Sequence, residues 1–178
     1  MRGYFGIGVE GISKAMNVGN LFRSAHAFGA SFVFTVAADY GRAGARADTT
    51  ATPGQVPLYP FADAAALTLP RGCILVGVEL LDEAVELPSF RHPRRAAYVL
   101  GRERGSLTPE MVARCDHLVR IPTRLCLNVA TAGAIVMYDR LLTLGRFARR
   151  PLIPGAAPEP LPAHAFGAPK ERRRRAAE

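Results

Sequence analysis

The stretch CILVGV, residues 73–78, decides the class of fold because it is apolar without a break. A strand with one solvated face alternates apolar and polar residues, whereas a continuous apolar run is typical of a strand buried on both faces of a parallel sheet. The stretch AAYVL, residues 96–100, has the same character, and SFVFTV, residues 31–36, is rich in β-branched and aromatic residues. These stretches predict strands of a mainly parallel sheet.

Segments with helical spacing separate the strands. Apolar residues follow Asn17, which stands where a helix N-cap belongs, at nearly helical intervals, and Gly29 ends that helix. Further elements continue the alternation, with strands over 4–9 and 117–121 and helices over 61–69, 109–115 and 128–144. Strands that alternate with helices predict an α/β domain with flanking helices.

The first strand contains GIGVEG, residues 6–11, which matches the G-x-G-x-x-G pattern of dinucleotide-binding proteins. That pattern needs its glycines between a strand and a helix, with an acidic residue about 20 positions further on to bind a ribose. Here the glycines lie inside the strand and in the turn after it, and no acidic residue falls at that distance. We therefore interpret them as strand and turn residues and exclude a nicotinamide-dependent oxidoreductase.

Length and composition favour one cytoplasmic domain over residues 1–150, followed by a disordered, basic, Pro- and Ala-rich tail over 151–178. The longest apolar run is shorter than the roughly 20 residues that cross a bilayer, and no signal segment is evident. Three cysteines without a C-x-x-C pair and four scattered histidines predict no metal site. The region 37–57 lacks apolar periodicity and is expected to be a long loop.

The formal net charge of +8 favours a polyanionic partner, although charge alone does not separate RNA from other partners. Three patches follow strand ends, namely NVGNLFRSA (17–25) with FG (28–29), LGRERG (100–105) with RIP (120–122), and LCLNVA (125–130). Because the carboxyl ends of parallel strands meet at one edge of a sheet, we expect the patches to share a site.

In order and spacing, the patches resemble the three signature motifs of the SPOUT superfamily, specifically its TrmH-type RNA 2′-O-ribose methyltransferases. The resemblance covers about residues 4–147. It implies an α/β sheet with a C-terminal trefoil knot that forms a pocket for S-adenosylmethionine, and a homodimer. Because the chain opens with its first strand, it looks like a minimal member without an N-terminal RNA-binding domain.

The resemblance assigns four catalytic residues: Arg23, Asn17, Glu103 and Asn128. It makes Arg23 the arginine that helps to remove the proton of the ribose 2′-hydroxyl. Because a guanidinium almost never deprotonates, stabilisation of the developing alkoxide is the physically safer role. A solvated surface position for Arg23 or Glu103, and a purely capping role for Asn17 or Asn128, stay open.

The resemblance also assigns the cofactor-binding residues, which are Val78, Gly101, Ile121, Cys126 and Leu127. Glycine at 101 lets the backbone approach a ligand closely. Cys126 stands where the family usually has serine, and a thiol is the weaker donor and acceptor.

The sequence therefore predicts a methyltransferase that uses S-adenosylmethionine to modify an RNA ribose, in tRNA first and rRNA second. The alternative is a catalytically silent RNA-binding or ribosome-assembly factor with the same fold. No metal and no membrane are expected as partners.

Overall fold

The computed structural model describes residues 3–39, 56–102 and 105–161. The chain divides into two compact units, 1–145 and 146–178. In the first unit, the described strands form one sheet in the order β3-β2-β1-β6-β4-β7-β5, and every neighbouring pair is parallel. The strands are β1 (Tyr4–Glu10), β2 (Phe32–Val36), β3 (Leu58–Phe61), β4 (Ile74–Val78), β5 (Val85–Glu86), β6 (Arg95–Leu100) and β7 (His117–Arg120). The predicted parallel α/β architecture is confirmed.

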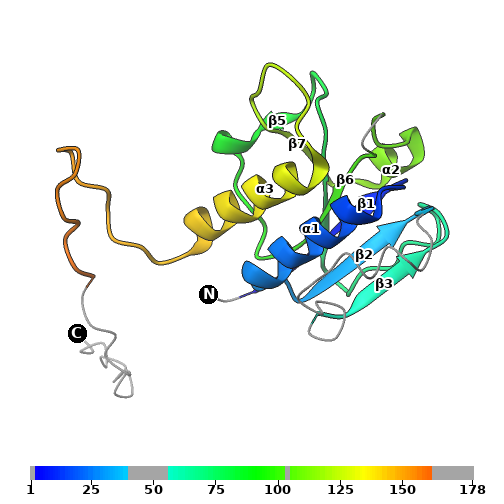
Figure 1. Ribbon diagram of the computed structural model, residues 1–178, viewed down its shortest axis with the longest axis horizontal. Helices are drawn as coiled ribbons and strands as arrows, with labels where there is room; N and C mark the ends of the chain where they lie inside the picture. Colours follow the sequence, from blue (N-terminus) through cyan, green and yellow to red (C-terminus); the bar gives the residue numbers. More distant parts are fainter. Residues whose placement is uncertain (1–2, 40–55, 103–104, 162–178) are drawn as a thin grey trace, which may run out of the picture. The chain divides into compact units, whose positions relative to one another are not determined.

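The helices α1 (Ala15–Ala27) and α3 (Val129–Leu144) lie side by side, as Figure 1 shows. They pack on one face of the sheet, over alternate residues of β1 such as Ile7 and Val9. The short helix α2 (Pro109–Arg114) joins the core on the other face, and its N-cap is Thr108. Both faces of the sheet are thus covered, as the continuous apolar strands require.

Two glycines of GIGVEG allow neighbouring residues to pack closely against β1, and the third lies in the turn after the strand. A Cβ on Gly6 would lie 2.2 Å from the ring of Phe32, and one on Gly8 would lie 2.4 Å from the carbonyl oxygen of Phe34. Gly11 has a φ of +63° in the turn after β1. The interpretation of these residues as strand and turn glycines is therefore confirmed.

The predicted start of the first helix is wrong, although its end is confirmed. Lys14 is the N-cap of α1, so the helix begins three residues earlier than predicted and Asn17 lies in its first turn. Ala15 and Met16, both good helix formers, favour this longer helix. At the other end, Gly29 has a φ of +73°, and the Ala30 amide donates to the Ala25 carbonyl.

The helix predicted over 61–69 is also wrong, because residues 58–61 form the edge strand β3 and turns follow it. The Asp63 carboxylate accepts the Ala66 amide at 2.8 Å, which fixes a turn. The guanidinium of Arg114 binds the carbonyls of this segment that a helix would use internally, those of Ala64, Ala65 and Leu67. Tertiary contacts thus override the helix propensity of the alanines. Besides β3, two other short elements of the described chain were not predicted, β5 and a 3₁₀ turn over Leu87–Ser89.

A buried polar network fixes α3 to the amino ends of β1 and β6. Arg140 is 1% exposed and donates to the carbonyls of Tyr4 and Arg94 and to the Tyr98 hydroxyl. The Tyr98 oxygen lies 2.6 Å from His92 Nδ1, and His92 Nε2 lies 2.9 Å from Asp139. One direction accounts for these side-chain hydrogen bonds: Arg140 donates to Tyr98, Tyr98 to His92, and His92 to Asp139. The buried Nε of Arg140 has no hydrogen-bond partner among the described residues.

Burial lowers the pKa of His92 and raises the pKa of Tyr98 to about 12. Both shifts favour the neutral side chains that this hydrogen-bond direction needs.

The remaining predictions for the chain's loops and tail are largely untested. The loop predicted over 37–57 falls mostly on residues 40–55, outside the described residues. Residues 146–161 contain bends and turns without a helix or strand, and 162–178 lie outside the described part. The disorder of the tail therefore stays a prediction.

Candidate active site

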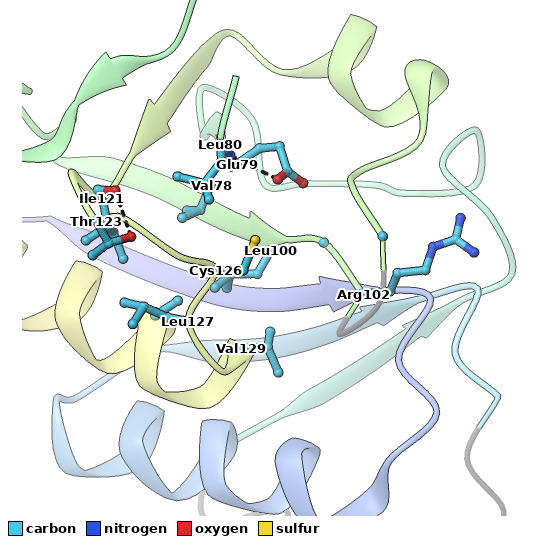
Figure 2. Close-up of a pocket in the computed structure, with 13 residues that line it drawn as sticks. Val78, Glu79, Leu80, Leu100, Arg102, Ile121, Thr123, Cys126, Leu127 and Val129 are labelled. Atoms are coloured by element: carbon cyan, nitrogen blue, oxygen red, sulfur yellow. Dashed lines mark hydrogen bonds between the residues drawn. The ribbon is translucent and has the colours of Figure 1, made fainter. Parts of the chain in front are cut away.

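A pocket of about 260 Å³ opens at the carboxyl edge of the sheet. The ends of β4, β6 and β7 form one wall, and the 121–128 loop with the first turn of α3 forms the other, as Figure 2 shows. Its lining is mostly apolar, and the polar or charged side chains in it are those of Glu79, Arg102, Thr123 and Cys126. Carboxyl edges of this kind are where open α/β sheets bind ligands.

The structure brings all five predicted cofactor-binding residues into this one lining, namely Val78, Gly101, Ile121, Cys126 and Leu127. Gly101 is required sterically, because an added Cβ would lie 2.8 Å from a Glu79 oxygen and 2.9 Å from the Leu107 nitrogen. The wall of the pocket is thus bare backbone at this point. Figure 2 places Cys126 and Leu127 opposite Val78 and Leu100.

Two glutamates hold the loop that follows β6, and neither was predicted. Glu79 accepts the Leu107 amide at 2.8 Å, and Glu10 accepts the Thr108 amide at 2.8 Å and the Thr108 hydroxyl at 2.7 Å. Glu10 is 4% exposed at the end of β1, so its charge is stabilised by these donors. The available signal was an acid directly after each buried strand.

Motifs one and three meet through their asparagines. The amide of Asn128 donates to Asn17 Oδ1 at 3.1 Å. Asn128 is also the N-cap of α3, since its Oδ1 accepts the amides of Ala130 at 2.9 Å and Thr131 at 3.4 Å. Asn128 therefore does cap α3, which was one of the roles left open for it, and the same side chain connects α1 to α3.

Of the other two predicted catalytic residues, the structure describes Arg23, which is not among the residues that line the pocket. Arg23 lies on α1 with an exposed side chain, and no hydrogen bond or ion pair joins it to any described residue. Glu103 lies outside the described residues. The roles of Arg23, Asn17, Glu103 and Asn128 stay predictions.

Within the described ranges, no group of three or more His, Cys, Asp or Glu side chains is arranged to hold a metal ion. Likewise, no described helix has the length and apolar character needed to span a membrane.

Comparison with known proteins identifies the family. The model of the SpoU rRNA methylase family matches residues 5–138, which include all three motifs. The chain belongs to the SpoU rRNA methylase family. The resemblance to TrmH-type SPOUT proteins is thereby confirmed.

Curated relatives of this SpoU-family chain include tRNA (guanosine(18)-2′-O)-methyltransferase of Escherichia coli K12, 28% identical over 140 residues. That match covers 74% of this chain and 60% of the relative. The mouse tRNA (guanosine(18)-2′-O)-methyltransferase TARBP1 is 28% identical over 72 residues, which are 39% of this chain and 5% of the relative. The chain therefore spans only part of the length of these two relatives.

Solved structures share the fold. A structure described as "Structural insights into the 2-OH methylation of C/U34 on tRNA" is 26% identical with a TM-score of 0.68, covering 81% of this chain and 99% of that one. An AdoMet-bound rRNA methyltransferase from Sinorhizobium meliloti is 20% identical with a TM-score of 0.70, covering 81% and 58%. The trefoil knot itself stays a prediction.

Proposed function

We propose that this protein methylates a ribose 2′-hydroxyl of RNA with S-adenosylmethionine as the methyl donor. The observation that carries the proposal is that the five residues assigned to the cofactor by the resemblance, which are distant in sequence, line one pocket at the carboxyl edge of the sheet. Family membership and the names of the relatives support the same chemistry.

The residues present fit the proposed cofactor. Apolar side chains of Val78, Leu100, Ile121 and Leu127 suit an adenine ring and a methionine stem, which need few polar contacts. At Gly101 the bare backbone admits a close approach that any side chain would block. When bound, S-adenosylmethionine supplies an electrophilic methyl group and leaves as S-adenosylhomocysteine.

The chain's own contribution to the reaction is orientation and charge. The Arg23 guanidinium keeps its donors unengaged by described residues, so it is available to stabilise the negative charge that develops on the ribose oxygen. The Asn17–Asn128 hydrogen bond holds the start of α1 against the start of α3, next to Val129 of the pocket. The proton of the hydroxyl passes to solvent or to a base other than the guanidinium, which does not titrate.

Transfer RNA is the substrate proposed first, because the curated relatives are named for tRNA methylation, and ribosomal RNA is the second. The alternative is a catalytically silent RNA-binding factor. The residue that favours it is Cys126 in the pocket wall, because its thiol forms weaker hydrogen bonds than the serine hydroxyl that the family usually has there.

We also propose that the protein acts as a homodimer through α1, α3 and the loop before α3. These elements expose large apolar side chains, of which Leu125 is 79% exposed, Met16 69% and Tyr138 51%. Such a surface is typical of an interface. Light scattering should give twice the chain mass at micromolar concentration, and Tyr138→Glu should shift it towards the monomer; a wild-type monomer would refute the assignment.

The test of function joins two measurements on the full chain. Calorimetry should show S-adenosylhomocysteine binding and no binding of NAD. Unmodified tRNA and rRNA incubated with labelled S-adenosylmethionine should gain label at a nucleotide that then resists alkaline cleavage, because a methylated 2′-oxygen cannot attack the phosphate. Cofactor binding without label in any RNA would favour the silent factor, and no cofactor binding would overturn both readings of the pocket.

A further inference from the structure

The side chain of Arg102 lies in a slot between two glycines. A Cβ added to Gly105 would lie 3.0 Å from Arg102 Cδ, and one added to Gly11 would lie 3.5 Å from Arg102 Cβ. Gly11 belongs to the turn after β1, and Gly105 to the loop after β6. The aliphatic stem thus passes close to both glycines, which leave room for it because they lack a side chain, and this position limits where its guanidinium can go.

The guanidinium of Arg102 is exposed and has no hydrogen-bond or ion-pair partner among the described residues. Arg23 also lacks such a partner, but three other arginines of the domain are engaged. Arg114 binds three carbonyls, Arg120 pairs with Glu86 at 3.2 Å, and Arg140 is buried in its network. Arg102 therefore combines a fixed stem with an unused set of donors.

The stem of Arg102 lines the pocket, whereas the guanidinium points away from its interior, as Figure 2 shows. We propose that Arg102 binds a phosphate of the RNA substrate and positions the target nucleotide at the mouth of the pocket. The inference rests on the proposed function and extends it to a substrate contact that the motifs do not assign.

The planar fork of a guanidinium matches two oxygens of one phosphate, and a pre-positioned fork loses little entropy on binding. The position of Arg102 beside Gly11 also places a phosphate contact close to the predicted catalytic residues. Gly11 leads within four residues to α1, which carries Asn17 and Arg23, so a phosphate at Arg102 would lie beside the predicted catalytic helix. An alternative anion is the carboxylate of the cofactor, but the guanidinium is directed out of the pocket that would hold it.

The experiment compares Arg102→Met, Arg102→Lys and a control, Arg71→Met, in the full chain. Arg71 is exposed and precedes β4, whereas the pocket lies at the other end of that strand. For each variant we would measure the affinity for S-adenosylhomocysteine, the affinity for substrate RNA and the slope of log K against log salt concentration.

We expect Arg102→Met to weaken RNA binding about tenfold at low salt and to reduce the slope by about 0.7 to 0.9, the value of one phosphate contact. Arg102→Lys should keep the slope, because it keeps the charge, and lose about threefold in affinity with the bidentate geometry. Affinity for S-adenosylhomocysteine should not change in either variant.

Three results would overturn the inference: an unchanged RNA affinity in Arg102→Met, an equal effect of Arg71→Met, or a loss of S-adenosylhomocysteine affinity, which would assign Arg102 to the cofactor carboxylate. The wild-type protein separates this failure from that of the proposed function. If the wild type binds cofactor and methylates RNA while Arg102→Met behaves as wild type, only the role of Arg102 is lost.

Discussion

Replacing Arg23 by alanine should remove catalysis without weakening the fold. The side chain is exposed on α1 and contacts no described polar group, so its loss leaves no buried atom without a partner. Alanine is also a strong helix former. We therefore expect the free energy of unfolding to change by no more than about 0.5 kcal/mol, as for other surface substitutions.

The expected effect of Arg23→Ala on the rate is much larger. A preorganised donor that stabilises an oxyanion contributes on the order of 3 kcal/mol to the barrier, which corresponds to a rate loss of a hundredfold or more. Affinity for S-adenosylhomocysteine should persist, because Arg23 does not line the pocket. Arg23→Lys should recover little of the rate, since an ammonium lacks the planar fork.

Single-turnover methylation and cofactor titration on the same preparation would test this prediction. Asn20→Ala is a matched control, because Asn20 is also exposed on α1 and lies less than one turn before Arg23. A rate within threefold of wild type would show that Arg23 is not catalytic. A parallel loss of cofactor affinity or stability would instead make Arg23 part of the pocket or of the fold.

Three further predictions concern the loop, the buried network and the tail. Glu10→Ala should cost about 3 kcal/mol in unfolding free energy by denaturant titration, because it leaves the Thr108 donors without their charged acceptor; Glu10→Gln should cost less. Because folding lowers the pKa of His92 below its ordinary value of 6.5, the contribution of neutral His92 to stability should be fully present above about pH 6.5. It should decrease as the pH falls from about 6.5 towards the pKa of His92 in the folded protein. His92→Gln should weaken this pH dependence of the melting temperature. Removing Arg172–Arg175 should reduce RNA affinity modestly and lower its salt slope, with cofactor affinity unchanged; an unaltered slope would show that the tail makes no contact.

Much of the fold was predictable because burial leaves a pattern in the sequence. The apolar runs at 73–78 and 96–100 became β4 and β6, and the helix expected over 128–144 became α3, since these signals are local. A helix was wrongly predicted for the alanine-rich segment after Phe61, because hydrogen bonds from Arg114, a residue distant in sequence, determine the conformation of that segment. Local propensity carries no information about such a contact.

The candidate site was likewise predictable only in part. The family resemblance was sufficient to name the five residues that the pocket gathers, but it gave no sign that Glu10 and Glu79 bind the loop between Gly101 and Thr108. Glu10 is the last residue of β1 and Glu79 directly follows β4, and the loop places two successive amides within reach of these two carboxylates. That pairing depends on β1 and β4 flanking β6 in the sheet, which is a property of topology.

The pocket and the buried Arg140 network lie at opposite ends of the sheet's strands. The pocket lies at the carboxyl ends of β4, β6 and β7, whereas Arg140 binds carbonyls at the amino ends of β1 and β6. Arg140 lies on the buried face of α3, where the helical spacing from Gly133 and Val136 predicts an apolar residue. A charged residue at such a position is the signal in the sequence that indicates a buried polar role. Because α3 carries Asn128 at one end and Arg140 towards the other, the network that fixes the helix also sets where the third motif meets the first. Substitutions in the network should therefore act on the site only through the placement of α3.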